Sequence, residues 1–390
     1  PMILNNIRPQ YTRFPNILPE GLTWETATTF DVGIDFSMFS GRFNFSGDWY
    51  NRKTTDMYTI GLTLPAVFGA TPPKGNYADL NTKGWELSVS WNDDFNVASK
   101  PFNYNLRLAL SDYRSVVTKY NNPDKLLTDY YPGMVIGEIW GYVTEGFFID
   151  DEDVANHAKQ SPEMRASPTN IWYAGDVKFK DLNNDGYINR GKNTVDDPGD
   201  RIIIGNRTPR YQFGINLGAD WSNIFFSAFI QGVGKQDWYP STECEFFWGQ
   251  YNRPYNNVPK WHLGNMWTPE NPNAYLPRTM SRAASSTTSR ELGVPQTKYL
   301  QNVAYVRLRN LQLGYSLPKQ LISRIGAKDL KVYFSGENLW DWSPLYKLIG
   351  NHLDVENTGP SDQEFTSGNA GDGYNYPMLM SFSFGLSITF

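Results

Sequence analysis

Apolar and polar residues alternate one by one along many segments of this chain. From Phe30 to Met38 every second residue is apolar, and Asp, Gly or Ser stands between the apolar positions. The same period of two recurs in segments 43–49, 85–91, 102–110, 211–221, 224–230 and 378–390. Because successive side chains of a β-strand point to opposite faces, this period predicts strands with one apolar and one polar face. Matches to this template predict roughly ten strands.

One segment breaks the period. Between residues 305 and 317 the apolar residues first stand at even positions, as Val306 and Leu308 do, and then at odd positions, as Leu311 and Leu313 do. An extra residue in one strand of an antiparallel pair produces such a slip. The pattern therefore predicts a β-bulge in this segment. If the strands cross a membrane, the alternative is that the strand leaves the membrane at this point.

The length and composition of the two faces favour a membrane barrel. The runs approach the ~9–11 residues that a tilted strand needs to cross a bilayer. Their apolar faces often end in Trp, Tyr or Phe, as in the aromatic girdles of outer-membrane barrels, and their polar faces are Ser, Asn, Gly and Asp. A soluble β-sandwich also alternates, but its strands are usually shorter. We therefore predict an all-β fold, a transmembrane antiparallel β-barrel.

The connections between the predicted strands fall into two classes. Those near Ser40, at 93–100 and near Ser222 are short, whereas the regions after residues 51, 112, 149, 231 and 339 are long and rich in Pro, Gly and Asn. Outer-membrane barrels have short turns on the periplasmic side and long loops outside the cell. We expect the loops at 236–296 and 341–376 to be extracellular.

Composition narrows the function classes. Mean hydropathy is −0.51, and no stretch approaches the ~20 consecutive apolar residues of a membrane-spanning helix, so helical membrane proteins are excluded. Aromatic residues make up 15% of the chain, with 33 Gly and 25 Pro, which favours strands and turns. The net charge is −5 without a basic cluster, so nucleic acid is not an expected partner.

Catalytic chemistry has little support in the sequence. His157, His262 and His352 are isolated, and Cys244 is the single cysteine, so neither an HExxH pair nor a cysteine zinc site is available. No G-x-S-x-G elbow or P-loop occurs, and no two carboxylates stand out as a glycosidase pair. We do not expect an enzyme.

A D-x-N-x-D-G run at residues 181–189 resembles the start of an EF-hand calcium loop. Asp181, Asn183 and Asp185 would supply side-chain oxygens to Ca²⁺, and Tyr187 its carbonyl oxygen. Lys192 stands where the bidentate Glu of an EF-hand would be, although a later Asp could complete the shell. The alternative is a tight Asx-rich turn that binds no ion.

Several longer segments carry a resemblance to a known family, in that family's order along the chain. They are LTWETATTFDVGIDFSMFSGRFNFSGDWYNRKTTDM at 22–57, NTKGWELSVSW at 81–91, DVKFKDLNNDGYIN at 176–189, DRIIIGNRTPRYQFGINL at 200–217, MWTPENPNAYLPR at 266–278, YVRLRNLQLGYSLPKQL at 305–321 and VYFSGENLW at 332–340. Together they resemble the SusC/RagA family of TonB-dependent transporters over nearly the whole chain.

The resemblance implies a fold, a location and partners. It implies a Gram-negative outer-membrane barrel of about 22 strands with a plug in its lumen, energised through TonB and capped by a SusD-like surface lipoprotein. Such a protein imports a glycan or a peptide. Residues 1–390 would be the C-terminal portion of the barrel with its long extracellular loops, because the first residues read like the middle of a longer chain. The plug, the TonB-contacting segment and the remaining strands are expected elsewhere.

The resemblance also suggests roles for aromatic residues. Those of the 236–296 loop could stack on a sugar, contact the lipoprotein lid, or pack on one another. The candidates for ligand or lid contact are Trp238, Phe247, Trp248, Trp261 and Trp267. Phe390, the terminal aromatic, resembles the signal that barrel-insertion machinery reads.

Two alternatives remain open. The barrel could be a receptor or a component of an assembly or secretion machine without transport of its own. A secreted β-rich protein that binds or hydrolyses glycans belongs to another class, although the barrel pattern favours the first group.

Overall fold

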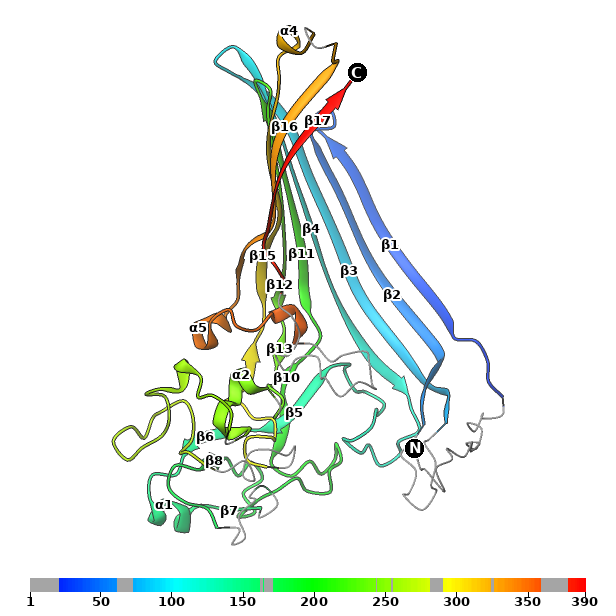
Figure 1. Cartoon of the computed structure of the whole chain (residues 1–390). Coiled ribbons are helices and arrows are strands. Elements are labelled where there is room, and N and C mark those ends of the chain that lie inside the picture. The colour runs from blue at the N-terminus through cyan, green and yellow to red at the C-terminus, as the bar shows by residue number, and fades with distance from the viewer. Residues whose placement is uncertain are drawn as a thin grey trace, which may run out of the picture.

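The computed structural model describes residues 21–61, 73–161, 164, 171–242, 244–253, 255–280, 290–323, 326–358 and 378–390. One large antiparallel sheet dominates, and a lobe of loops lies at one end of it (Figure 1). Among the described residues, no helix combines the length and the apolar character needed to cross a membrane.

In the part of the chain that the structure describes, the large sheet has nine strands in the order β1-β2-β3-β4-β11-β12-β15-β16-β17, where roughly ten were expected from the alternation. Each strand pairs antiparallel with its neighbours in this order. The strands are β1 (Thr26–Met38), β2 (Phe43–Ile60), β3 (Lys74–Val97), β4 (Lys100–Lys119), β11 (Arg210–Trp221), β12 (Ile224–Lys235), β15 (Tyr305–Ser316), β16 (Asp329–Trp342) and β17 (Ser381–Thr389). Among described residues, β1 and β17 form the two edges of this sheet.

The register of the sheet places the alternating apolar side chains of all nine strands on the same face. Leu108 of β4 lies opposite Ile215 of β11, which lies opposite Ile230 of β12, which in turn lies opposite Leu308 of β15. The same row-by-row match joins the neighbouring strands, as in Val32↔Trp49↔Trp85 and Val332↔Leu386. A slip of one residue would move a whole strand's apolar set to the other face. We call the surface formed by this parity the outer face, and the opposite polar surface the inner face.

The predicted slip in the 305–317 segment is a β-bulge. The pairing of β15 jumps from Leu308 to Asn310 against both β12 and β16 and leaves Arg309 between. The extra residue switches the parity, so Leu308 and Leu311 both pair with apolar outer-face positions on β12. The bulge therefore keeps the outer face continuous.

Short and long connections separate to the two ends of the sheet, as the sequence predicts (Figure 1). Two hairpins turn on two residues with positive φ, Ala98-Ser99 (48° and 61°) and Ser222-Asn223 (50° and 71°). This is the type I′ geometry, whose twist matches that of the flanking strands. The carboxyl end of β17 lies at this short-turn end, and Phe390, just beyond β17, is exposed.

The long connections fold into a lobe of small elements at the other end of the sheet. Its two-stranded sheets are β5–β10, β6–β8, β7–β9 and β13–β14. The strands are β5 (Glu138–Tyr142), β6 (Thr144–Phe147), β7 (Lys159–Gln160), β8 (Val177–Phe179), β9 (Tyr187–Ile188), β10 (Arg201–Asn206), β13 (Asp237–Trp238) and β14 (Gln301–Asn302). The helices within the described residues are α1 (Asp151–Asn156), α2 (Glu245–Trp248), η3 (Gly249–Tyr251), η4 (Lys260–His262), α4 (Lys319–Ile322), α5 (Tyr346–Ile349) and η6 (Val355–Asn357). Of these, α4 lies at the short-turn end of the sheet.

This lobe has its own hydrophobic core. Buried residues from segments 142–188, 233–305 and 345–355 form one cluster, which includes Phe179, Tyr251 and Tyr299. The long connections are thus packed on one another rather than spread out singly.

A buried ion-pair network ties the connection after β16 to the sheet. The Arg307 guanidinium of β15 contacts the carboxylates of Asp354 at 2.9 Å, Glu356 at 3.2 Å and Asp341 at 3.4 Å. Arg309, the bulged residue, also pairs with Glu356. Removing one partner of such a buried group strongly destabilises a protein, because the other charge stays buried. The network therefore fixes residues 354–356 against the inner face.

Candidate functional site

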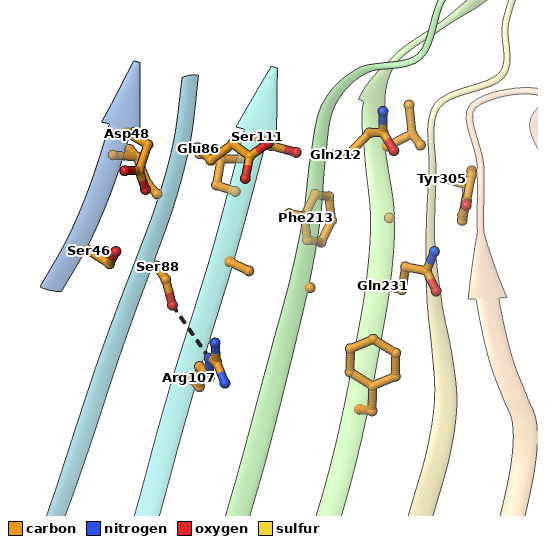
Figure 2. A pocket seen from close by; sticks show the side chains of 17 residues that line it. Ser46, Asp48, Glu86, Ser88, Arg107, Ser111, Gln212, Phe213, Gln231 and Tyr305 are labelled. Carbon is orange, nitrogen blue, oxygen red and sulfur yellow. Dashed lines mark hydrogen bonds between the residues drawn. The ribbon is translucent and has the colours of Figure 1, made fainter. Parts of the chain in front are cut away.

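The inner face of the sheet carries a broad polar trough (Figure 2). Side chains of β2, β3, β4, β11, β12 and β15 line a hollow of about 570 Å³. The labelled polar groups in it are Ser46, Asp48, Glu86, Ser88, Arg107, Ser111, Gln212, Gln231 and Tyr305. The polar groups named above belong to the parity that does not face outward, whereas Leu87, Leu110 and Phe213 of the other parity also line the hollow. The polar character of the trough therefore follows from the alternation.

The trough contains charged groups of both signs. Asp48 and Glu86 pair directly across β2 and β3. Arg107 is on β4, and its Nε donates a long hydrogen bond of 3.4 Å to the Ser88 hydroxyl. Neither carboxylate has an ion-pair partner within the described segments. The trough therefore offers carboxylate, hydroxyl and amide groups and a guanidinium to whatever fills the lumen.

The aromatic residues predicted to touch a ligand or a lid lie mostly inside the lobe. Trp238, Phe247, Trp248 and Trp267 are buried, Phe247 completely, whereas Trp261 is half-buried. Phe247 packs on Trp248 with ring centroids 4.7 Å apart, and Trp248 packs on Tyr299 at 5.2 Å. These edge-to-face contacts are the favoured aromatic geometry. For the four buried rings, the structure favours the self-packing alternative over contact with a ligand or a lid.

The exposed apolar side chains of the same loop are different ones. Phe246, Tyr255, Val258 and Leu263 are exposed. Phe246 and Trp261 line a groove of about 620 Å³ between this loop and the connection after β16, to which Leu348 and His352 contribute. Phe246 directly precedes Phe247 in sequence, so no spacing signal distinguishes the outward ring from the buried one.

His262 is a buried structural residue of the loop. Its Nε2 lies 2.9 Å from the Phe247 carbonyl oxygen, its Nδ1 lies 3.1 Å from the Gln250 amide oxygen, and its ring packs edge-on against Trp261 at 4.3 Å. Burial lowers the pKa of His262 to about 4, although the hydrogen bond to Phe247 acts in the opposite direction. The neutral imidazole therefore joins two turns of the loop.

The residues of the proposed calcium loop are brought together, but their oxygens already accept hydrogen bonds from the loop itself. The Asp181 carboxylate accepts from the Asn184 N–H at 2.7 Å and the Gly186 N–H at 2.9 Å. Asn183 and Asp185 accept from the N–H groups two residues onward, which is the Asx-turn pattern. In the described part of the chain, no group of three or more His, Cys, Asp or Glu side chains has a metal-binding arrangement. Each carboxylate oxygen keeps a second lone pair, so calcium binding stays a prediction.

The Asp200 carboxylate binds the backbone at both ends of this loop. It is fully buried and accepts from the Leu182 N–H at 2.8 Å and from the Asn189 N–H at 2.9 Å. Burial raises the pKa of Asp200, while these two hydrogen bonds lower it. Asp200 therefore closes the turn from both ends, a role that the sequence pattern alone did not assign.

The buried imidazole predicts acid sensitivity of the loop around it. The unfolded chain binds this proton near pH 6.5 and the folded loop only near pH 4, so acidification favours the unfolded loop. The stability of the loop should be complete above pH 6.5 and fall by up to about 3 kcal/mol toward pH 4. Hydrogen exchange of residues 245–265, corrected for intrinsic pH dependence, measures this change. His262→Gln should remove most of it, and an equal pH response in that variant would contradict the assignment.

Comparisons with known proteins agree with the fold and with the resemblance. A scan against models of protein families found no match. TonB-dependent receptor P26 of Formosa agariphila is 27% identical over 384 residues, which cover 95% of this chain and 35% of that protein. TonB-dependent receptor SusC of Bacteroides thetaiotaomicron is 23% identical over 421 residues, which cover 100% of this chain and 35% of SusC. The chain therefore spans about a third of the length of these relatives.

Solved structures give the same picture at the level of the fold. A chain of the RagAB peptide importer in its closed-closed state matches with a TM-score of 0.64 and 20% identity, over 95% of this chain and 36% of that one. The open-open state of the same importer gives 0.63 and 19%. The relatives are named as receptors and the solved structures as those of an importer. The predicted membrane-barrel fold is confirmed, and so is the resemblance: over nearly all of its length the chain is similar to proteins named TonB-dependent receptors, SusC among them, and it shares the fold of a chain of the RagAB importer.

Proposed function

We propose that this chain forms part of the wall and the outer loops of a TonB-dependent transporter, which imports a glycan or a peptide across the outer membrane of a Gram-negative bacterium. The observation that carries the proposal is the two-faced sheet. Its outer face is apolar across nine strands, and its inner face is a polar trough. A lipid-facing surface and a wet lumen require this division.

The open edges of the sheet support the same role. Unpaired backbone N–H and C=O groups are not tolerated in the hydrocarbon core of a bilayer. Within the described residues β1 and β17 each pair on one side only. We therefore infer that further strands of the whole protein complete the barrel and that its plug covers the inner face.

A SusD-like lipoprotein is the proposed lid over the loop lobe. The lobe lies at the end of the sheet opposite the short turns, which is the extracellular end in outer-membrane barrels. The exposed residues Phe246, Tyr255 and Leu263, together with half-buried Trp261, are the proposed contacts in place of the buried rings. Phe390 remains the proposed assembly signal, since it is exposed just beyond β17, at the short-turn end of the sheet that we propose to be periplasmic.

Transport should depend on the proton-motive force. In cells that carry the whole protein, accumulation of fluorescent oligosaccharides or oligopeptides should fall to background with an uncoupler and in a strain without TonB. A passive porin would show no such loss. Equal accumulation under all three conditions, or surface binding without accumulation, would contradict the proposal and favour a receptor.

The 181–189 loop is proposed to bind Ca²⁺ with affinity in the ~10⁻⁴–10⁻³ M range typical of extracellular modules. Terbium luminescence sensitised by Tyr187 reports binding, and competition with Ca²⁺ gives its affinity. Asp181→Asn should weaken binding at least about tenfold by removing one charged ligand, whereas Asp94→Asn in β3, near the short-turn end of the sheet, should leave it unchanged. A signal that neither variant alters would mean that the loop is a simple turn.

A further inference from the structure

Three basic side chains lie together on the outer face of the sheet, toward its long-loop end. Lys83 of β3 pairs directly with Arg114 of β4. Lys53 of β2 pairs with Asn81, which precedes Lys83 by two residues on β3. Because the period of a strand is two, all three stand on the same face as Trp85. Lys53, Lys83 and Arg114 are exposed, and we call them the basic cluster.

The basic cluster lies just beyond the apolar band of the outer face. Aromatic side chains flank the band of an outer-membrane barrel at both interfaces. On β3 the aromatic residues of this face at the two ends of the band are Phe95, near the short turn, and Trp85. The segment between them matches the ~9–11 residues that a tilted strand needs to cross a bilayer. Lys83 is the next residue of this face after Trp85, so the cluster lies at the level of the lipid headgroups.

The pairing of these cations is unfavourable unless an anion joins them. Residues directly opposite each other in an antiparallel pair have Cβ atoms about 4.5–5.5 Å apart, and like charges in such positions destabilise the sheet. Lys83 and Arg114 are such a pair, and Lys53 is a diagonal neighbour of Lys83. An anion in contact with the cluster would replace this repulsion by attraction.

The acidic groups next to the basic cluster are engaged elsewhere. Asp112, two residues before Arg114 on β4, is bound in a fork by Nε and Nη2 of Arg210. Asp79 of β3 accepts a hydrogen bond from a backbone N–H of β2 at 2.9 Å. The sequence of the β2–β3 connection, residues 61–73, contains no Asp or Glu. The strands that carry the cluster therefore do not supply its counterion.

Two amides between the cations lack hydrogen-bond donors. Asn51 pairs with Lys83, and Asn81 pairs with Lys53. The side-chain oxygens of both are buried, and no donor of the described residues reaches them. A buried polar group without a partner costs free energy, so these amides, like the cations, indicate a ligand at this surface. Rotation of the flexible lysine side chains toward an anion would open access to both amides.

We propose that the basic cluster binds the phosphate of lipid A, the acylated phosphosaccharide of the outer leaflet of Gram-negative outer membranes. A guanidinium binds phosphate in a fork, and an ammonium binds it as a point charge. The saccharide hydroxyl groups would donate to Asn51 and Asn81, and the acyl chains would lie along the exposed side chains of Ile34 and Leu87 in the apolar band.

This inference rests on the proposed function, because it requires the long-loop end of the sheet to be extracellular. Lipid binding needs neither TonB nor energy, so its failure is distinguishable from a failure of transport.

The test uses the whole protein, purified in detergent and freed of bound lipid, and measures lipid binding by native mass spectrometry at one fixed salt concentration. The probes are monophosphoryl lipid A, the same lipid without its phosphate, and phosphatidylglycerol. Monophosphoryl lipid A should bind at least about tenfold more tightly than the form without phosphate, because only the phosphate makes charge-assisted hydrogen bonds with the cluster. It should also bind more tightly than phosphatidylglycerol, which lacks the saccharide.

A pair of double variants locates the site. Lys83→Gln with Arg114→Gln removes the directly paired cations and should weaken binding of monophosphoryl lipid A about 10-fold or more. Arg42→Gln with Lys100→Gln removes the same charges at the short-turn end and should leave the affinity unchanged. Without lipid, the first variant should unfold at a temperature no lower than that of the unaltered protein, because the repulsion between the paired cations is gone. Gel migration before and after heating checks that each variant is folded.

Five results would overturn the proposal. They are the absence of binding by monophosphoryl lipid A, equal binding of the form without phosphate, equal or tighter binding of phosphatidylglycerol, unaltered affinity in the cluster variant, and an equal loss in the short-turn variant. Tight binding of phosphatidylglycerol that the cluster variant loses would assign the surface to anionic phospholipids instead.

Discussion

The pleat of a β-strand sends successive side chains to opposite faces, and both surfaces of this protein depend on that constraint. Leu108, Ile215, Ile230 and Leu308 lie in one cross-strand row because the register keeps their parities together. The same register places Ser88 and Arg107 of the neighbouring strands in the polar trough. The bulge at Arg309 preserves this division where the sequence parity changes. The outer face is therefore suited to lipid, and the inner face to water and polar cargo.

The two ends of the sheet differ because the short connections lie at one end and the long connections at the other. One end carries short connections, two of which are two-residue type I′ turns, while the other end carries a lobe with its own aromatic core. The connection after β16 is joined to the sheet through Arg307, which pairs with Asp354 and Glu356 of that connection and with Asp341 of β16. Movement of residues 354–356 would leave the buried guanidinium with Asp341 alone, which is costly. The lobe can thus present its grooves in a defined position above the lumen.

The strands could be predicted from the sequence because alternation is a local signal, and even the bulge was visible as a change of parity. The lobe could not be predicted in the same way. Phe246 is exposed and Phe247 is fully buried, although the two are adjacent and chemically identical. The choice between them depends on packing with Trp248 and Tyr299, which no local period encodes. The basic cluster combines residues of β2, β3 and β4, so only the register of the folded sheet brings its two lysines and Arg114 together.

The orientation of the two faces is the central claim, and a pair of substitutions on β11 tests it most directly. Ile215 belongs to the outer face and Gln212, opposite Ser111 and Val233, to the inner face. An Arg on the lipid face near the bilayer midplane costs about 2–4 kcal/mol, whereas lumen positions tolerate it. In the whole protein, Ile215→Arg should therefore reduce the heat-modifiable, folded form in the outer membrane, and Gln212→Arg should leave its amount near that of the unaltered protein. Equal amounts for both variants, or a larger loss for Gln212→Arg, would contradict a membrane-facing outer surface.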